Sequence, residues 1–195
     1  TQIGNDYIVM VGQPLGNIWG YKCDGRYSVY DFSWDSSKKT WVLNDGVADD
    51  SSLIGGSFGP GSLKIKDIAQ AVDSDGNPIA SNANKIYEND KTIIGNTQPK
   101  FTGGFNLSGF WKGLDFSANF NFVYGNQIYN ANRIEFTSSR GYYRRNYLKG
   151  MEPENRWTNI DWNTGEIITD AATLEAVNAG TTMWSPSMNR AILTD

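Results

Sequence analysis

Histidine is absent from the 195 residues of this chain, and cysteine occurs once, at Cys23. Without histidine, a Ser-His-Asp or Cys-His catalytic arrangement and an HExxH zinc site are both excluded. A lone cysteine supplies neither an intrachain disulfide nor a thiolate cluster for a metal ion. These absences remove several common hydrolase and metal-site chemistries.

Basic residues are also scarce. The chain has 17 Lys and Arg against 21 Asp and Glu, a formal net charge of −4, and the basic residues form no run. Because neutralising phosphates requires a basic face, we expect no nucleic-acid partner.

Long apolar runs are missing as well. No stretch approaches the roughly 18 consecutive apolar residues of a spanning helix, which excludes a helical membrane protein. The strands of a membrane β-barrel are only about ten residues long and alternate apolar with polar residues. Such strands leave little trace in mean hydropathy, so this argument does not exclude a membrane β-barrel.

Aromatic residues, in contrast, are concentrated in one segment. Residues 101–124 hold eight aromatics among 24 residues and only two charges, Lys112 and Asp115. On either side, segments of about 21–99 and 125–195 are rich in Gly, Asn, Asp and Ser. Such lengths are unusual for the loops of a compact soluble domain.

The central segment alternates with a period of two. The apolar parity flips after Lys112-Gly113, as a two-residue hairpin loop with Gly at its second position requires. We therefore predict a hairpin over 101–124 in which Trp111 pairs with Leu114 and Phe105 with Phe120. The apolar face holds Phe101, Gly103, Phe105, Leu107, Gly109 and Trp111, with Leu114, Phe116, Ala118, Phe120, Phe122 and Tyr124 opposite them.

Two interpretations of this hairpin stay open. Strands of about 11 residues extend roughly 36 Å and, tilted about 45°, cover the apolar band of a membrane barrel, about 25 Å tall. The alternative is a long amphipathic hairpin in a soluble β-sandwich that serves as a carbohydrate-binding or adhesion module. Length, aromatic density and the Asn-rich opposite face favour the barrel. Its lipid-facing residues are then Phe105, Leu107, Phe116, Phe120 and Phe122.

Two further elements are predicted from local signals. Residues 7–21 mix aliphatic residues with Pro14 and several glycines, which indicates a strand that ends in a turn. Residues 171–179 are typical of a short helix, with Asp170 as N-cap and Gly180 as terminator.

Seven short motifs, none specific alone, follow one another between residues 8 and 130, and their order resembles the SusC/RagA family of TonB-linked outer-membrane nutrient transporters. They are VGQPLG at 11–16, WGY at 19–21, DGRY at 24–27, GPGSLKIKD at 59–67, KTIIGNTQPKF at 91–101, GGFNL at 103–107 with LDFS at 114–117, and YGNQIYN at 124–130. Beyond residue 130 the resemblance thins to Asn155-Arg156-Trp157-Thr158.

The resemblance implies an all-β fold, an antiparallel transmembrane barrel of about 22 strands with long extracellular loops. The chain would be a C-terminal part of that barrel, without the plug domain. It would hold a strand at about 7–21, an outer loop at about 22–98, the hairpin at 101–124 and a second outer loop at about 125–195. A short turn at Lys112-Gly113 suits the periplasmic side, so both long connections would face outside the cell.

The resemblance also implies a function. Family members import oligosaccharides or peptides, which they hold between the barrel and a SusD-like surface lipoprotein, with energy from TonB acting through the plug. We therefore expect an importer in the bacterial outer membrane, in contact with its lipid, and no enzymatic activity.

Tryptophans in the two long polar segments are the candidate substrate or partner contacts. We single out Trp34, Trp41, Trp157 and Trp162, because amphipathic aromatics suit both stacking on sugar rings and protein interfaces. Packing within the loops is the alternative, and we favour it for any single tryptophan.

Acidic residues offer a candidate metal site and a candidate catalytic pair. Asp73, Asp75 and Asn77 alternate oxygen ligands as a calcium loop does, but Asn84 stands where such a loop needs its closing glutamate. A solvated turn without an ion is the favoured interpretation, so we expect no cofactor other than possible calcium. Glu152 and Glu154 flank Pro153, which is typical of an exposed turn rather than a glycosidase pair. We predict no catalytic residue.

Overall fold

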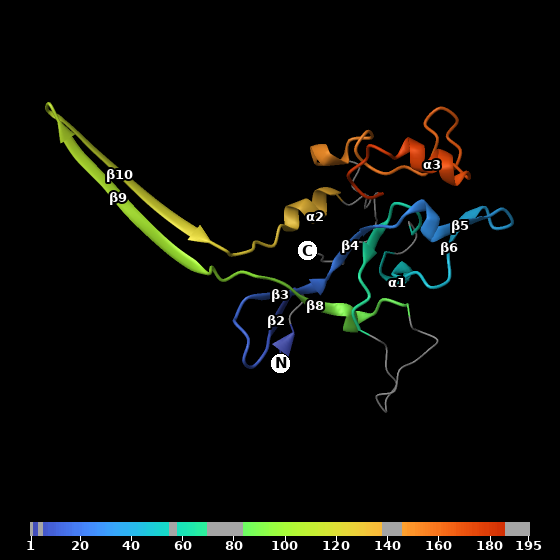
Figure 1. Cartoon of the computed structure of the whole chain (residues 1–195), viewed down its shortest axis with the longest axis horizontal. Coiled ribbons are helices and arrows are strands. Elements are labelled where there is room, and N and C mark those ends of the chain that lie inside the picture. Colours follow the sequence, from blue (N-terminus) through green and yellow to red (C-terminus); the bar gives the residue numbers. More distant parts are fainter. Residues whose placement is uncertain (1, 4–5, 55–57, 70–83, 138–145, 186–195) are drawn as a thin grey trace. The chain divides into compact units, whose positions relative to one another are not determined.

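The computed structural model describes residues 2–3, 6–54, 58–69, 84–137 and 146–185. The chain divides into two compact units, the first of residues 1–19 and 93–129 and the second of residues 20–92 and 130–195. We call the second the loop unit. Over the described residues of the chain as a whole, strands predominate over short helices, consistent with an all-β fold (Figure 1).

A four-stranded sheet begins the first unit, in the order β1-β2-β3-β8. Its strands are β1 (Gln2–Ile3), β2 (Tyr7–Val9), β3 (Asn17–Tyr21) and β8 (Lys91–Asn96). Residues 7–21, which we expected to form one strand, therefore form two antiparallel strands. The reason is that Gly12 and Gly16 adopt φ of 82° and 81°, and the chain reverses between them.

The predicted hairpin is confirmed residue for residue. β9 (Phe101–Trp111) and β10 (Leu114–Tyr124) pair antiparallel along their whole length, from Leu114 opposite Trp111 to Tyr124 opposite Phe101 (Figure 1). Lys112 and Gly113 connect them with φ of 48° and 86°. Positive φ at both central residues is the type I′ geometry, whose twist matches that of the strands.

A polar cluster, the Asn96 clasp, joins three stretches of the first unit. Asn96 Nδ2 donates to Asn17 Oδ1 at 2.5 Å and to the Leu15 carbonyl at 3.3 Å. The Asn96 backbone N–H donates to Gln127 Oε1 at 2.9 Å, and the Gln127 N–H donates to the Asn96 carbonyl at 2.8 Å. The clasp therefore ties the turn before β3 and the end of β8 to the chain that leaves β10.

The loop unit holds two small antiparallel pairs. β4 (Cys23–Arg26) pairs with β7 (Leu63–Ile65), and β5 (Phe32–Asp35) pairs with β6 (Thr40–Leu43). On the second pair, Phe32 and Trp34 share a face with Trp41 and Leu43. The segments predicted as long outer loops thus contain regular structure of their own.

Helices in the described residues are short. They are η1 (Val29–Asp31), α1 (Ser51–Ile54), η3 (Glu88–Asp90), α2 (Ala131–Thr137), η4 (Lys149–Met151) and α3 (Ala171–Val177). The predicted helix after Asp170 is confirmed as α3, and the Asp170 carboxylate accepts from the Thr173 N–H at 2.8 Å. No helix among the residues described is long and apolar enough to cross a membrane.

Two apolar clusters form the core of the loop unit. One consists of Val29, Trp157, Ile168 and Leu174, and the other of Tyr21, Ile65 and Ile86. The first cluster contains residues from both segments of the loop unit, 20–92 and 130–195. The Trp41 indole N–H, in the first segment, donates to the Ile168 carbonyl, in the second, at 3.3 Å. The two predicted outer loops therefore pack together as one unit.

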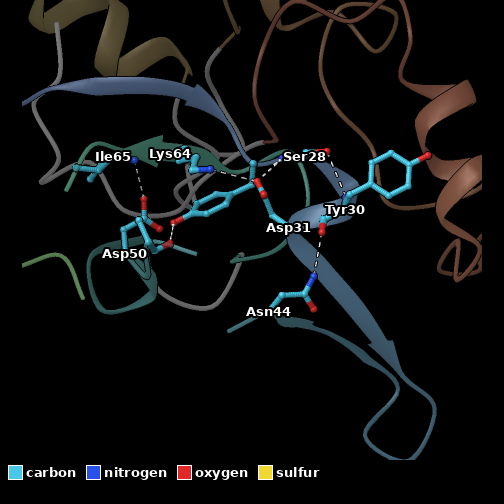
Figure 2. Close-up of polar contacts among 9 residues, drawn as sticks. Ser28, Tyr30, Asp31, Asn44, Asp50, Lys64 and Ile65 are labelled. Atoms are coloured by element: carbon cyan, nitrogen blue, oxygen red, sulfur yellow. Dashed lines mark hydrogen bonds and ion pairs between the residues drawn. The ribbon is translucent and has the colours of Figure 1, made fainter. Parts of the chain in front are cut away.

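Hydrogen bonds around η1 connect it to both strand pairs (Figure 2). The Tyr30 N–H donates to Ser28 Oγ at 3.2 Å, and the Ser28 N–H donates to the Asp31 carboxylate at 2.9 Å, which makes a capping box. Lys64 of β7 lies 3.4 Å from the same carboxylate. Asn44, beyond β6, donates to the Tyr30 carbonyl at 2.9 Å.

Asp50 is fully buried between β7 and the start of α1 (Figure 2). Its Oδ2 accepts from the Ile65 N–H at 3.1 Å, whereas Oδ1 has no hydrogen-bond partner among the described residues. Burial raises the pKa of Asp50 to about 7, even though the Ile65 N–H and the Tyr27 hydroxyl favour the carboxylate. The folded chain therefore binds a proton at Asp50 more tightly than the unfolded chain does.

Asp90 is buried in a different way, because its carboxylate is fully paired. It accepts from the N–H groups of Ile68, Ala69 and Tyr87 at 2.9, 2.8 and 2.7 Å. Nearby, the Asp49 N–H donates to the Asn84 carbonyl at 2.6 Å. These bonds fix the backbone on both sides of residues 70–83.

The burial of Asp50 makes a pH-dependent prediction. Because its folded pKa of about 7 lies above the ordinary 3.8, its protonation stabilises the fold fully below about pH 4, and this contribution is lost as pH rises to about 7. The loss amounts to roughly 2–4 kcal/mol. The Asp50→Asn side chain keeps an acceptor for the Ile65 N–H and cannot ionise. The free energy of unfolding of this variant should therefore fall less than that of the native chain between about pH 4 and pH 7.

Urea unfolding of both chains across this pH range tests the prediction. Burial also raises the pKa of Asp67. The stability of both the native chain and the Asp50→Asn variant should therefore depend on pH to some extent through Asp67. The difference between the two curves isolates Asp50, and parallel curves would show that Asp50 does not take up the proton.

Candidate functional site

One face of the hairpin is a continuous apolar surface. Its large side chains are between 46% (Phe122) and 66% (Trp111) exposed. Phe105 and Phe120 stack across the strands with ring centroids 4.7 Å apart, and Phe101 stacks on Tyr124 at 4.9 Å. Cross-strand aromatic pairs of this kind stabilise a sheet. The pairs leave the outer surface of each ring uncovered by the described residues.

Two glycines on this face lie beneath aromatic rings. A Cβ at Gly109 would meet the Phe116 ring at 2.5 Å, and one at Gly103 would meet the Phe122 ring at 2.6 Å. The rings therefore lie flat across the glycines and extend the apolar surface over them. The lipid-facing residues predicted from the sequence, Phe105, Leu107, Phe116, Phe120 and Phe122, all belong to this one face.

The opposite face is polar. Asn106 donates to the Asn119 side-chain oxygen across the strands, Ser108 lies opposite Ser117, and Asn121 lies opposite Gly104. Two apolar side chains also lie on this face, Phe110 opposite Asp115, which the sequence also showed, and Val123 opposite Thr102. A sheet with one apolar and one polar face separates two environments of different polarity.

Both ends of the apolar face carry amphipathic aromatics. At the turn, Lys112 Nζ lies 5.0 Å from the centroid of the Trp111 ring, a cation–π contact. At the other end lies the Phe101–Tyr124 pair. Aromatic girdles at both interfaces are typical of membrane strands.

Trp34 and Trp41 form one of the candidate contacts on the loop unit. They are cross-strand neighbours on β5 and β6, with ring centroids 5.6 Å apart and an interplanar angle of 68°. Both are half-buried, and the Trp41 N–H is already bonded to the Ile168 carbonyl. Trp34 retains an exposed part, while Trp41 holds the pair against the core.

Trp157 occupies a structural position. It is 7% exposed, its indole N–H donates to Asn159 at 2.7 Å, and its ring packs over Gly61, where a Cβ would lie 2.1 Å from ring carbons. Gly61 also has a φ of 79°, so both its conformation and its space require glycine. Trp157 is therefore part of the core, and its indole is not accessible to a ligand.

Trp162 is the opposite case, because it is 60% exposed and lines a pocket of about 370 Å³. Its ring lies 5.8 Å from the Arg156 guanidinium carbon. The pocket is lined by Pro153, Glu154, Arg156, Thr158, Trp162, Val177, Asn178 and Thr181. Sequence reasoning singled out Trp162 and missed Arg156 and Val177, since these come together only through the packing of α3.

Asn178 builds the pocket. Its Nδ2 donates to the Thr158 and Leu174 carbonyls, each at 2.8 Å, and its Oδ1 accepts from the Thr158 N–H at 2.8 Å. This buried amide therefore fixes the end of α3 against the segment that carries Arg156 and Trp162. Asn178 lies near the end of the helix predicted over 171–179 and is its C-cap in the structure, and an asparagine at such a position is the sequence signal that could have indicated the cap.

The sequence also contains a candidate metal site and a candidate pair of glutamates. Asp73, Asp75 and Asn77 lie outside the described residues. Within the described ranges, no group of three or more Cys, Asp or Glu side chains could hold a metal ion. Glu152 and Glu154 are both exposed on a turn.

Comparison with known proteins gives one informative match. A protein named TonB-dependent receptor P39, from Formosa agariphila, is 31% identical over 131 residues, which are 63% of this chain and 12% of that protein. This similarity supports the TonB-dependent receptor family. No family model matches the chain, and no solved structure matches it significantly. The chain therefore compares with only a small part of a TonB-dependent receptor.

The different burial of Trp157 and Trp162 predicts different effects on stability. Trp157→Ala removes a buried ring and should lower the free energy of unfolding by about 3–5 kcal/mol. Trp162→Ala removes an exposed ring and should change it by no more than about 0.5 kcal/mol. Urea unfolding followed by far-UV circular dichroism measures both, and an equal loss would contradict the assignment of Trp162 to the surface.

Proposed function

We propose that this chain is part of an outer-membrane TonB-dependent importer of oligosaccharides or peptides that works with a SusD-like surface lipoprotein. The similarity to a TonB-dependent receptor supports outer-membrane nutrient transport in general. The order of motifs along residues 8–130 supports the SusC/RagA subtype. Energy would come from TonB through a plug region, and the chain itself would act as a transporter segment without enzymatic activity.

The exposed apolar face of the β9–β10 hairpin is the observation that carries the proposal. Phe120, at the middle of this face, is 47% exposed and stacks on its cross-strand neighbour Phe105. Contiguous exposed apolar surfaces mark membrane or protein contacts. Strands of 11 residues match the length needed to cross the apolar layer with tilt.

A soluble β-sandwich module is the competing function. It would cover the apolar face with a second sheet, and Phe120 would then be buried in a closed core. The exposure of Phe120 and the aromatic residues at both ends of the strands favour lipid as the covering medium.

The topology of the proposal follows from the two ends of the hairpin. At one end, Lys112-Gly113 is a two-residue turn, as barrel turns on the periplasmic side are. Both connections to the loop unit leave from the other end, before Phe101 and after Tyr124. We infer that the loop unit is extracellular, where substrate and lipoprotein would meet it.

The surface of the loop unit supports a partner in that place. Several of its large apolar side chains are more than a third exposed, among them Tyr30, Val42, Ile160, Ile167 and Val177. Amphipathic and apolar residues of this kind are enriched at interfaces.

A matched pair of substitutions tests the membrane assignment in the complete receptor. Phe120→Arg places a charge on the lipid face near the bilayer midplane, at a cost of roughly 2–4 kcal/mol. Asn121→Arg, its neighbour in the chain, places the same charge on the polar face at far lower cost. Outer-membrane assembly, measured by fractionation and heat-modifiable migration, should fail for the first and survive for the second. Equal tolerance of both would remove the lipid-facing assignment.

The orientation of the loop unit has its own test. A short epitope inserted between Lys38 and Lys39, at the exposed tip of the β5–β6 hairpin, leaves both apolar clusters untouched. On intact cells an antibody should bind this epitope. An epitope inserted at Lys112-Gly113 should bind only after the outer membrane is opened, and the reverse pattern would invert the topology.

A further inference from the structure

The polar groups of the Trp162 pocket fall into two classes. Three of them are already used within the loop unit. The Thr158 hydroxyl bonds to the Ile160 backbone at 3.1 Å. The Thr181 hydroxyl donates to the Asn178 carbonyl at 2.8 Å and accepts from Arg26 at 2.9 Å, and the Asn178 amide is bonded as described above. These groups shape the pocket and have little capacity left for a ligand.

Glu154 and Arg156 form the second class. Neither side chain has a hydrogen bond or an ion pair to another residue of the described chain, and the Arg156 guanidinium carbon lies 5.8 Å from the centroid of the Trp162 ring. They are two residues apart and carry opposite charges, yet they do not pair. The pocket thus presents one acceptor, the Glu154 carboxylate, and one donor, the Arg156 guanidinium, each available to a ligand.

The apolar wall of the pocket completes the pattern. Trp162 and Val177 line it, and they are 60% and 48% exposed. An exposed indole with an aliphatic side chain nearby gives a flat apolar platform beside the two charged groups. Ligand sites are built in this way, from an apolar surface and a few convergent polar groups.

We propose that this pocket binds a neutral pyranose ring of an oligosaccharide, with Trp162, Glu154 and Arg156 as its contacts. This inference rests on the proposed function and selects one of its two substrate classes. The flat C–H face of the sugar packs on the Trp162 indole. One ring hydroxyl donates to the Glu154 carboxylate, and a neighbouring hydroxyl accepts from the Arg156 guanidinium.

Charge and hydroxyl chemistry select this ligand class. The charges of Glu154 and Arg156 cancel, so the pocket does not favour a polyanion. A hydroxyl group both donates and accepts, so two adjacent hydroxyls satisfy the acid and the guanidinium together. A peptide end matches only one of the two side chains by charge, and it lacks the flat C–H face that packs on the Trp162 indole.

The test measures ligand binding to the complete receptor in detergent. The probes are an array of neutral oligosaccharides and a set of tripeptides. The affinity of each probe that the receptor binds is then measured by calorimetry. The receptor should bind a neutral oligosaccharide, and Trp162→Ala should lower the affinity about tenfold or more. Glu154→Gln and Arg156→Gln should each lower it severalfold, and Trp162→Phe should retain part of it.

Tyr147→Ala is the matched control, because Tyr147 is an exposed aromatic of the same unit that does not line the pocket. Its affinity should equal that of the native receptor. Raising the salt concentration from about 0.05 to about 0.5 M should change sugar affinity little, since no ligand charge is screened.

Four outcomes would overturn the inference: no neutral oligosaccharide retained, equal affinity in the pocket variants and the control, tripeptides bound in place of sugars, or binding that salt abolishes. If the receptor assembles in the outer membrane but shows one of these outcomes, the pocket assignment fails and the importer proposal stands. If Trp162-dependent sugar binding is found in a chain that does not enter the membrane, the pocket assignment stands and the importer proposal fails.

Discussion

The backbone conformation at Lys112-Gly113 is the constraint on which the first unit depends. Two consecutive residues with positive φ reverse the chain in the smallest number of residues and set the register of the eleven pairs from Trp111–Leu114 to Phe101–Tyr124. Because side chains alternate between faces, a shift of one residue would mix phenylalanines with asparagines on both faces. The separation of the hairpin into an apolar and a polar surface is therefore decided at the turn.

Elsewhere, hydrogen bonds of polar side chains hold separate stretches of the backbone together. Asn96 joins three stretches of the first unit, Asn178 fixes α3 beside the pocket, and Asp90 holds three backbone N–H groups. In segments with few apolar residues, such hydrogen bonds satisfy backbone groups that regular sheets would otherwise pair. This explains how sequences rich in Asn, Asp and Gly still form a unit with an ordered core.

Local signals were sufficient to predict the hairpin and α3. The period of two, the glycine at the turn and the Asp170 cap are all properties of neighbouring residues. The loop unit could not be found in this way, because its contacts join distant residues, such as Gly61 with Trp157 and Trp41 with Ile168. Its strands are three or four residues long and too short to show alternation. The pocket was missed for the same reason, although Trp162 stood out as an unexplained tryptophan.

The Asp90 carboxylate has a consequence for how such a chain varies through evolution. It holds Ile68, Ala69 and Tyr87, while Asp49 bonds to Asn84, so the backbone is anchored on both flanks of residues 70–83 independently of what those residues are. Closing a longer loop between fixed ends adds little free energy, because the entropic cost grows only with the logarithm of its length. Insertions and deletions can therefore accumulate between Ala69 and Asn84 while the core around Ile65 and Ile86 is inherited unchanged. Relatives of this chain should therefore differ in length between Ala69 and Asn84 before they differ in the buried residues on either side.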